Sequence, residues 1–328
     1  MLRRHALAAL TLGGIASLAA CQDSLALAPT DTPDLNLEKL PGEDTELGDA
    51  QHRYIAGGGG CRLHVVETGN RKGQPIVFLH GISQSWLSWS AQLCSELRRR
   101  YHLVAIDLRG HGLSDRPAAG YDDSQLWADD VDAVIRELSL DRPILSGWSY
   151  GPLVILDYVR RYGESRIGGV QFVDGISKLG SAAALSVLTP AMLAIVPGLF
   201  STDAETSVRG LQSLVHLCFA HQPSAAEQYT ILGYNVSVQP SVRQAMFSRT
   251  IDNDDLLATI RKPVLITHGS ADAIVKVDIV AEFQRLLPNA QIQIIAGAGH
   301  APFRDDAPAF NHRLAAFAEE IERANRGT

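Results

Sequence analysis

Residues 143–155 read PILSGWSYGPLVI, an apolar run that stops at a cluster of small residues and then resumes. The interruption, GWSYG at residues 147–151, is a Gly-x-Ser-x-Gly pentapeptide centred on Ser149. A sharp turn from a strand into a helix places the central residue in strained backbone, and larger side chains two positions away on either side would collide with neighbouring backbone. Pro152 suits the first turn of the new helix, because that turn needs no N–H donor. The pentapeptide also arises by chance in many proteins, so a nucleophilic role for Ser149 depends on the rest of the chain.

Apolar, strand-like runs alternate with longer amphipathic segments from residue 53 onward. Strands that read as unbroken hydrophobic runs are buried on both faces. Such strands in alternation with helices predict an α/β fold, with a mostly parallel central sheet wrapped by helices. We expect strands at 53–56, 61–68, 75–80, 103–107, 143–148, 167–174, 263–269 and 291–295, and helices at 86–100, 121–138, 152–162, 277–287 and 305–323.

The alternation breaks over residues 176–255, which contain helical stretches but no clear strand. The segment is too long for a loop inside a compact domain, so we expect a helical cap over the carboxyl edge of the sheet. The core would then comprise residues 51–175 and 256–328. The apolar side chains of the cap could simply pack the lid or could form a hydrophobic pocket. They are Leu185, Val187, Leu188, Met192, Leu193, Ile195, Val196, Leu199 and Phe200.

Three side chains with complementary chemistry each follow a predicted strand: Ser149, Asp272 and His300. Chemistry in an open parallel sheet collects at the carboxyl ends of the strands. A serine hydroxyl needs a base such as histidine to remove its proton, and the imidazole needs a carboxylate to fix its tautomer. Asp174 ends another strand and is an alternative acid, although such a residue more often caps a turn.

Five motifs occur in order along the chain: His80-Gly81-Ile82, DLRGHGLS at 107–114, GWSYG at 147–151, HGSADAIV at 268–275 and GAGHAPF at 297–303. Together they resemble the α/β-hydrolase family, in its lidded branch of esterases and lactonase-like enzymes. The resemblance covers residues 53–325. It implies an α/β-hydrolase fold with Ser149 as nucleophile, His300 as general base and Asp272 as orienting acid. It also implies an oxyanion hole made by the backbone N–H groups of Ile82 and Tyr150.

The neighbours of the triad divide into substrate contacts and scaffolding. We expect Ile82, Trp148 and Tyr150 to line the substrate pocket, while packing alone would also account for the two aromatic residues. The remaining histidines have no metal-ligand spacing, and the chemistry requires no cofactor, so neither a metal nor a cofactor is expected. The residues expected to support the site are His80, Asp107, Arg109 and His111.

The expected function is cleavage of carboxylic esters or lactones through an acyl-enzyme, with small uncharged substrates. Cofactor-free haloperoxidases, which resemble perhydrolases, use the same triad and form the first alternative. The second is a ligand-binding surface lipoprotein without catalysis. Epoxide hydrolases and dehalogenases of the family use an aspartate nucleophile, and the serine at position 149 disfavours them.

The N-terminus reads as a secretion signal. Arg3 and Arg4 precede an apolar stretch at 6–20 that is too short to span a bilayer comfortably. Leu18-Ala19-Ala20-Cys21 resembles the lipobox of bacterial lipoproteins, which implies a signal peptide at 1–21, lipid attachment at Cys21, and an exported protein anchored to a membrane facing the periplasm or the exterior. An ordinary secretory signal cut nearby is the alternative.

Charge is concentrated just after that signal. Residues 22–50 hold eight acidic residues and one base, Lys39, out of a net charge of −7 for the 328-residue chain. We expect a solvated, flexible tether. The chain has no basic block, so nucleic acid is not an expected partner. Cys61, Cys94 and Cys218 imply no disulfide framework, although a Cys61–Cys94 bridge stays open, as does the oligomeric state.

Overall fold

The computed structural model describes residues 50–326, so the predicted signal peptide, Cys21 and nearly all of the acidic tether lie outside the described residues. One eight-stranded sheet organises this part of the chain, in the order β1-β2-β4-β3-β5-β6-β9-β10. β2 runs antiparallel to both of its neighbours, and the other pairs are parallel. The strands are β1 Gln51–Ala56, β2 Arg62–Gly69, β3 Pro75–Leu79, β4 His102–Ile106, β5 Ile144–Trp148, β6 Gly169–Val173, β9 Val264–Gly269 and β10 Gln291–Ile295.

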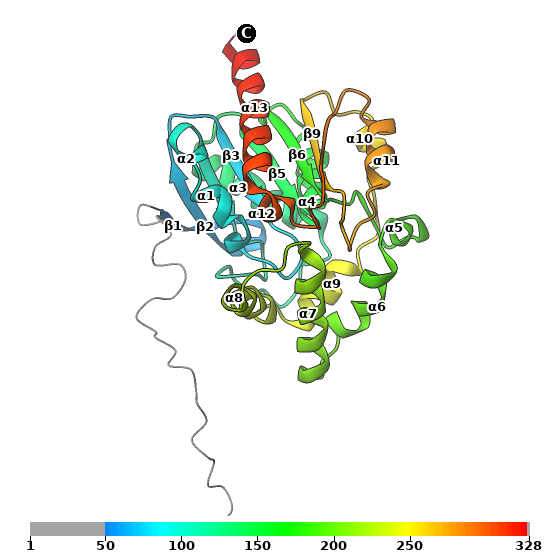
Figure 1. The fold of residues 1–328 in the computed structure, drawn as a ribbon. Coiled ribbons are helices and arrows are strands. Elements are labelled where there is room, and N and C mark those ends of the chain that lie inside the picture. Colours follow the sequence, from blue (N-terminus) through cyan, green and yellow to red (C-terminus); the bar gives the residue numbers. More distant parts are fainter. Residues whose placement is uncertain (1–49, 327–328) are drawn as a thin grey trace, which may run out of the picture. The chain divides into compact units, whose positions relative to one another are not determined.

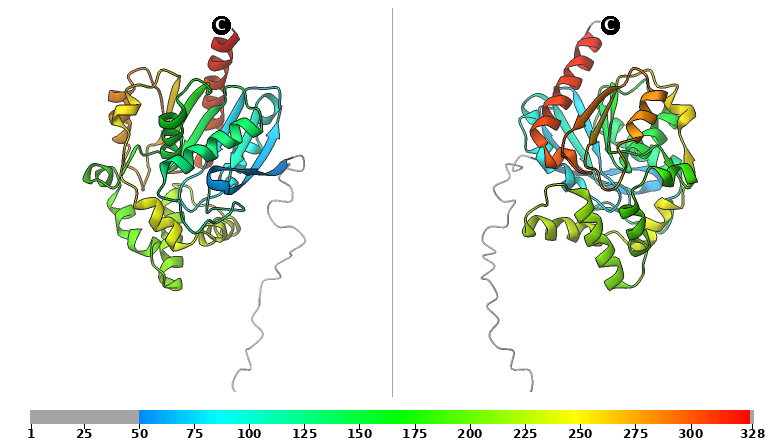
Figure 2. Two further views of the ribbon diagram at one scale, coloured as in Figure 1. Left: turned by 180° about the vertical axis from the view of Figure 1, so that it is seen from behind. Right: turned by 45° about the vertical axis from the view of Figure 1, so that its right-hand side comes forward.

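The central strands are buried along their whole length, as their unbroken apolar sequences predict. Helices cover both faces of the sheet (Figures 1 and 2): α13 crosses one face, and α3 and α4 lie on the other. The mostly parallel sheet flanked by helices confirms the predicted fold class. The helices of the core are α1 Ser90–Leu93, α2 Leu97–Arg100, α3 Ser124–Glu137, α4 Gly151–Tyr162, α10 Asp254–Leu257, α11 Ile279–Leu286, α12 Pro302–Asp305 and α13 Ala307–Arg326.

The predicted continuous helix over 86–100 is wrong. The segment forms a 3₁₀ turn, Trp86–Trp89, followed by the two short helices α1 and α2. The break falls at Ser95, whose hydroxyl donates to the carbonyl of Gln92 at 2.7 Å and accepts from the N–H of Leu97 at 3.2 Å. A serine side chain that bonds to nearby backbone groups competes with the helical pattern, and apolar spacing alone does not reveal this competition.

The segment between β7 and β8 forms five helices, of which α6 to α9 lie below the sheet in Figure 1. A small antiparallel pair closes the base of this segment, with Lys178 opposite Asp252 and Leu179 opposite Ile251. Strands of two residues are too short to show an alternating pattern, so sequence patterns do not reveal them. The elements are β7 Lys178–Leu179, α5 Ala182–Ser186, α6 Pro190–Leu199, α7 Ala204–Cys218, α8 Ala225–Val236, α9 Pro240–Phe247 and β8 Ile251–Asp252.

The structure also bears on the possible Cys61–Cys94 disulfide and on membrane-spanning helices. Cys61 is a buried thiol that forms no disulfide, so the Cys61–Cys94 bridge does not form in this structure. Within residues 50–326, no helix has both the length and the apolar character needed to cross a membrane.

Candidate active site

Ser149 lies at the turn between β5 and α4, in the left-handed backbone region with φ of 57°. A Cβ atom added to Gly147 would come within 2.6 Å of the carbonyl carbon of Gly151. One added to Gly151 would come within 2.6 Å of the carbonyl oxygen of Leu79. The N–H of Ser149 donates to the carbonyl of Val173 on β6 at 2.9 Å, which fixes the turn to the neighbouring strand. The pentapeptide is therefore a strained elbow that admits only glycine two residues before and after the serine.

His300 and Asp272 form the orienting pair. Nδ1–H of His300 donates to Oδ2 of Asp272 at 2.8 Å, and both side chains are almost completely shielded from solvent. The other carboxylate oxygen accepts from the N–H groups of Ile274, at 2.7 Å, and Val275, at 3.0 Å. Burial alone would raise the pKa of Asp272, but His300 and these donors hold it below its ordinary value. An ionised Asp272 holds the proton on Nδ1 of His300, which leaves Nε2 available as a base.

Asp174 lies beside this pair but has different partners. Its Oδ1 accepts from the N–H of Gly269 at 2.8 Å, and its buried Oδ2 accepts no hydrogen bond from a described residue. Burial and the nearby negative charge of Asp272 raise the pKa of Asp174 well above its ordinary value. Because His300 bonds to Asp272, the geometry favours Asp272 over Asp174 as the orienting acid.

Ser149 and His300 line the same cavity, one from the elbow after β5 and the other from the loop after β10. The structure contains no hydrogen bond between these two described side chains. Catalytic hydrogen bonds of this type often tighten only when substrate binds.

The two predicted oxyanion donors lie beside the elbow. Gly81 approaches Ser149 so closely that an added Cβ would lie 3.0 Å from the serine Cβ and 3.5 Å from Oγ. Within residues 50–326, the N–H groups of Ile82 and Tyr150 donate to no other backbone or side-chain group. Two unused amide donors next to a strained serine are the arrangement that an oxyanion requires.

A buried histidine network supports the turn that carries Ile82. His80 donates through Nδ1 to the carbonyl of Gly81 at 2.7 Å and accepts through Nε2 from the N–H of Leu108 at 3.0 Å. His111 accepts from the N–H of Ser83 at 3.2 Å. Burial lowers the pKa of both histidines, which keeps them neutral and able to accept these bonds.

The two charged residues of the 107–114 motif also have structural partners. Asp107 accepts from the N–H of Trp86 at 2.8 Å and from the His64 ring at 2.7 Å. Arg109 binds both carboxylate oxygens of Asp130 at 2.7 Å. These contacts agree with the scaffolding role expected for the motif.

The cavity has a volume of about 400 Å³ and lies between the triad and the cap. Its lining is almost entirely apolar and includes the predicted pocket residues Ile82, Trp148 and Tyr150. Of the apolar cap residues named from the sequence, Leu185, Leu188 and Met192 reach the cavity. No Asp, Glu, Lys or Arg side chain from residues 50–326 lines it.

Lys178 and Lys276 do not supply charge to the cavity. Lys178 pairs with Asp254 at 2.7 Å, and Lys276 donates to the carbonyl of Ser186 at 2.7 Å. The apolar lining therefore favours an uncharged ligand.

The family model described as alpha/beta hydrolase fold matches residues 74–307. The chain belongs to this family. It is 28% identical over 273 residues to the AB hydrolase superfamily protein YisY of Bacillus subtilis, covering 78% of this chain and 95% of that protein. It is 29% identical to a non-heme haloperoxidase of Rhodococcus erythropolis, over 81% of this chain and 99% of that protein. Among solved structures, the esterase RhEst1 from Rhodococcus sp. ECU1013 superimposes with a TM-score of 0.78 at 36% identity, covering 82% and 99% of the two chains.

This α/β hydrolase holds its histidine loop with a contact that the sequence did not suggest. The indole N–H of Trp148 donates to the backbone carbonyl of His300 at 2.6 Å, so a residue beside the serine also positions the imidazole. Trp148 is only 2% exposed, and it both packs in the core and lines the cavity. Core packing and a place in the substrate pocket, the two roles considered for Trp148, are therefore compatible.

A second unforeseen contact joins the cap to the elbow. The hydroxyl of Tyr150 accepts from Arg249 at 2.8 Å, and Arg249 also binds Asp157 of α4. Burial raises the pKa of Tyr150 to about 12, so its hydroxyl stays neutral. Arg249 is far from any motif in the sequence, and only the folded cap brings it to this site.

In the described part of the chain, one group of three side chains is close enough together to be tested as a metal site. Ligand-type atoms of Asp174, Asp272 and His300 lie within 4.8 Å of one another. A metal ion at this point would displace the hydrogen bond that orients His300, and the three side chains are shielded from solvent. The donor set therefore fits proton transfer better than metal binding.

Proposed function

We propose that this α/β hydrolase cleaves carboxylic esters or lactones through an acyl-enzyme. The proposal is supported chiefly by the Asp272–His300 hydrogen bond, which prepares an imidazole base in the cavity that Ser149 also lines. Esterases and other hydrolases among the relatives support the same reaction class. Ester specificity is inferred from the apolar cavity and from these relatives.

The first half-reaction forms the acyl-enzyme. Oγ of Ser149 attacks the carbonyl carbon while Nε2 of His300 takes the hydroxyl proton. The negative charge that develops on the carbonyl oxygen is stabilised by the N–H groups of Ile82 and Tyr150, and one such donor is worth roughly 3–4 kcal/mol in the transition state. The C–O bond to the alcohol then breaks, and His300 gives its proton to the leaving oxygen.

The second half-reaction releases the acid. Water enters, His300 removes its proton, and the resulting nucleophile attacks the acyl carbon. Collapse of the tetrahedral intermediate returns the proton to Ser149. We infer small, uncharged esters or lactones as substrates, because the cavity is about 400 Å³ and lacks charged lining residues among those described.

A second candidate activity is perhydrolysis with halide oxidation, which the similarity to non-heme haloperoxidases favours. Hydrogen peroxide would replace water in the second half-reaction and release a peracid, which would oxidise halide. The same triad carries out both reactions without a cofactor.

Two assays on one set of variants separate these candidates. Hydrolysis would be measured on short esters, lactones and amides, and halogenation of monochlorodimedone would be measured in acetate with peroxide and bromide. We expect ester or lactone hydrolysis to exceed halogenation, and Ser149→Ala to abolish both. Preferred cleavage of peptides or anionic esters would contradict the proposed substrate class.

We also propose that the protein is an exported lipoprotein anchored through Cys21. The support is the signal-like sequence at 1–21 and the acidic stretch that follows it. The anchor would hold the hydrolase body beside a membrane, facing the periplasm or the exterior.

A further inference from the structure

Helices α5 and α6 present an exposed surface that carries no charge. No Asp, Glu, Lys, Arg or His occurs from Leu179 to Thr202. Leu185 is 55% exposed and Leu193 is 40% exposed, although both are large apolar residues. We call this surface the uncharged cap face; its exposed residues are Ala182, Ala183, Leu185, Ser186, Pro190, Ala191, Leu193, Ala194 and Pro197.

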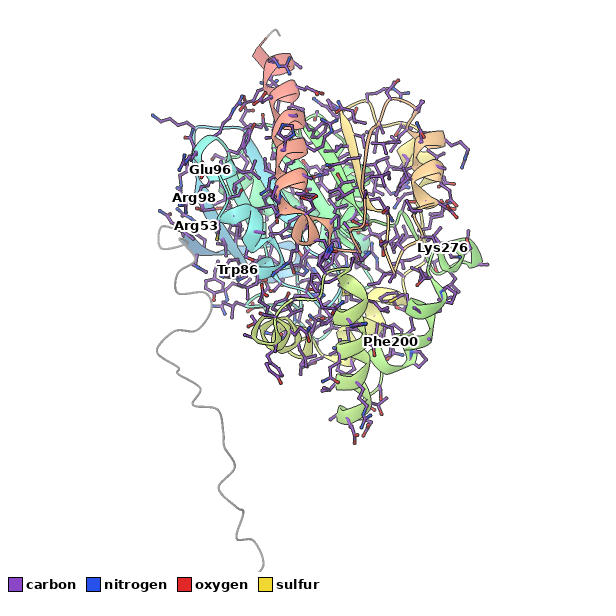
Figure 3. All side chains as sticks on the ribbon, viewed as in Figure 1. Arg53, Trp86, Glu96, Arg98, Phe200 and Lys276 are labelled. Atoms are coloured by element: carbon purple, nitrogen blue, oxygen red, sulfur yellow. The ribbon has the colours of Figure 1, made fainter. Side chains whose placement is uncertain are left out.

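The opposite side of α6 is already packed. Gly198 meets Gly210 of α7 so closely that a Cβ added to Gly210 would lie 2.7 Å from the carbonyl carbon of Gly198. Met192 and Leu199 are buried on that side. Figure 3 shows Phe200 within this part of the cap and Lys276 at its edge. Charge therefore occurs only at the rim of the uncharged cap face, and the apolar side chains on the face itself are left to solvent.

The same two helices form a wall of the cavity. Ala184, Leu188 and Met192 line the cavity from within, and Leu185 lines it while remaining more than half exposed. An apolar path thus leads from the outer surface of the cap to the space beside Ser149. A lipophilic molecule that contacts the uncharged cap face would lie next to the cavity.

The chemistry of the face suits lipid better than another protein. A specific protein interface carries about one hydrogen bond per 100–200 Å² and a polar rim. Apart from Ser186, whose hydroxyl donates to the carbonyl of Ala183 at 2.7 Å, the exposed side chains of this face offer no donor or acceptor. Contiguous exposed apolar surface marks interaction sites. An uncharged lipid surface needs no such partners.

The sequence outside the described residues supplies a second reason. Residues 6–20 are apolar, and Cys21 precedes the first described residue, Ala50, by 29 positions. A random coil of that length would span about 30 Å on average, and like charges would extend it further. Under the lipid anchor proposed above, the hydrolase body would remain within reach of the membrane.

We propose that the uncharged cap face docks on an uncharged lipid surface. Docking places the apolar wall of the cavity against the lipid, so that neutral esters dissolved there reach Ser149 without crossing water. The docking itself does not depend on catalysis, whereas the delivery of substrate rests on the proposed ester hydrolysis.

A tryptophan placed on the face tests docking without any turnover. Full-length protein carrying Leu193→Trp would be mixed with phosphatidylcholine vesicles whose acyl chains are brominated, since bromine quenches only tryptophans that touch it. Ile294→Trp, at a 43% exposed position on β10, is the matched control, and the wild-type signal is subtracted from both. We expect a blue shift and quenching for Leu193→Trp and neither for Ile294→Trp, because an apolar face that docks on a bilayer is buried at the boundary between the headgroups and the acyl chains.

Other results overturn the proposal. Quenching at both positions would mean contact through the anchor alone, and quenching at neither would mean no contact. A need for anionic lipid would contradict an uncharged surface. A dimer in sedimentation that shields Leu193→Trp without lipid would assign the face to a second copy of the chain. Ser149→Ala should leave the quenching unchanged, which separates failure of docking from failure of the proposed activity.

A charge on the face tests substrate delivery. Leu193→Glu should lower hydrolysis of an ester dissolved in the vesicles by about tenfold, equivalent to about 1.4 kcal/mol of docking energy. It should leave hydrolysis of a water-soluble short ester unchanged, because Leu193 does not line the cavity. Ile294→Glu should change neither rate. Equal losses on both substrates would show that the substitution damages the enzyme, and no loss on either would contradict delivery through this face.

Discussion

Asp272 and Asp174 are two buried carboxyl groups that lie beside one imidazole and have different hydrogen-bond partners. Asp272 accepts from His300 and from two backbone N–H groups, whereas Asp174 accepts only from Gly269 among residues 50–326. Two carboxylates this close cannot both ionise without a large cost, so the one that accepts more hydrogen bonds takes the charge. We assign the proton of the pair to Asp174.

Replacing each acid by its amide tests this assignment in the reaction. Asp272→Asn removes the carboxylate that fixes the tautomer of His300, so kcat should fall by about 10³–10⁴-fold. Asp174→Asn should keep activity near the wild-type level, because an uncharged amide then replaces an uncharged acid beside Asp272. Steady-state kinetics on a short ester measure both. The reverse ranking would identify Asp174 as the orienting acid.

The pH dependence of stability tests the protonation of Asp174 independently. Its pKa is raised above the ordinary value of 3.8 by burial and by the charge of Asp272; His268, His300 and Asp305 are the other titratable groups nearby. As the pH rises, the carboxyl group of Asp174 therefore loses its proton at a lower pH in the unfolded chain than in the folded chain. From about pH 4 upward, the wild type should lose about 1.4 kcal/mol of stability per pH unit relative to Asp174→Asn, until the folded carboxyl ionises. Urea unfolding at several pH values gives the difference in unfolding free energy between the wild type and Asp174→Asn. A difference that does not change with pH would contradict a protonated Asp174.

The sequence revealed the three candidate triad side chains but not the role of Asp174. Ser149, Asp272 and His300 each follow a strand, and strand ends can be recognised from apolar runs. The interaction of Asp174 with Asp272 depends on β6 lying next to β9, although a whole cap separates these strands in the chain. Strand order is a tertiary property that no local pattern encodes.

At the scale of elements, Arg249 links the cap to the core. It follows α9 and binds Tyr150 at the elbow and both Asp157 and Ser124 on the core helices. Both charged side chains of the Arg249–Asp157 pair are buried. Removing one partner of a buried pair leaves the other charge without compensation.

A double-mutant cycle measures this link. Arg249→Met should cost about 3–5 kcal/mol of unfolding free energy, since Asp157 stays buried without its partner. Adding Asp157→Leu should recover a large part of that loss. Tyr150→Phe should cost only about 1 kcal/mol and should retain activity, because the proposed oxyanion donor is the backbone N–H of this residue. Denaturant unfolding of Arg249→Met, Asp157→Leu, the double variant and Tyr150→Phe measures these free energies. If the losses of the two single variants of the pair simply add in the double variant, Arg249 and Asp157 do not interact directly.

The sequence predicted long elements better than short ones. β10 has the expected bounds, and α4 begins one residue earlier than expected, because buried apolar runs mark them clearly. The prediction of one helix over 86–100 is wrong because the side chain of Ser95 interrupts a helix that apolar spacing alone favoured. The pair β7–β8 was missed because two residues show no periodicity.

At the scale of the whole molecule, the proposed anchor and the hydrolase body should be separable. Cys21→Ala should release the protein from the membrane fraction while kcat/KM on a water-soluble ester stays unchanged, because residues 22–50 separate Cys21 from the hydrolase body in the sequence. Fractionation of cells followed by the esterase assay measures both properties. Retention of the variant in the membrane fraction would contradict lipid attachment at Cys21, and loss of soluble activity would contradict independence of the body.

The whole account depends on Ser149 being an activated nucleophile. Labelling with a fluorophosphonate, followed by peptide mapping in a mass spectrometer, tests this most directly. We predict one adduct, on Ser149, that is lost in Ser149→Ala and strongly slowed in His300→Ala. An unlabelled wild-type protein, or an adduct on another serine with full activity in Ser149→Ala, would contradict the account.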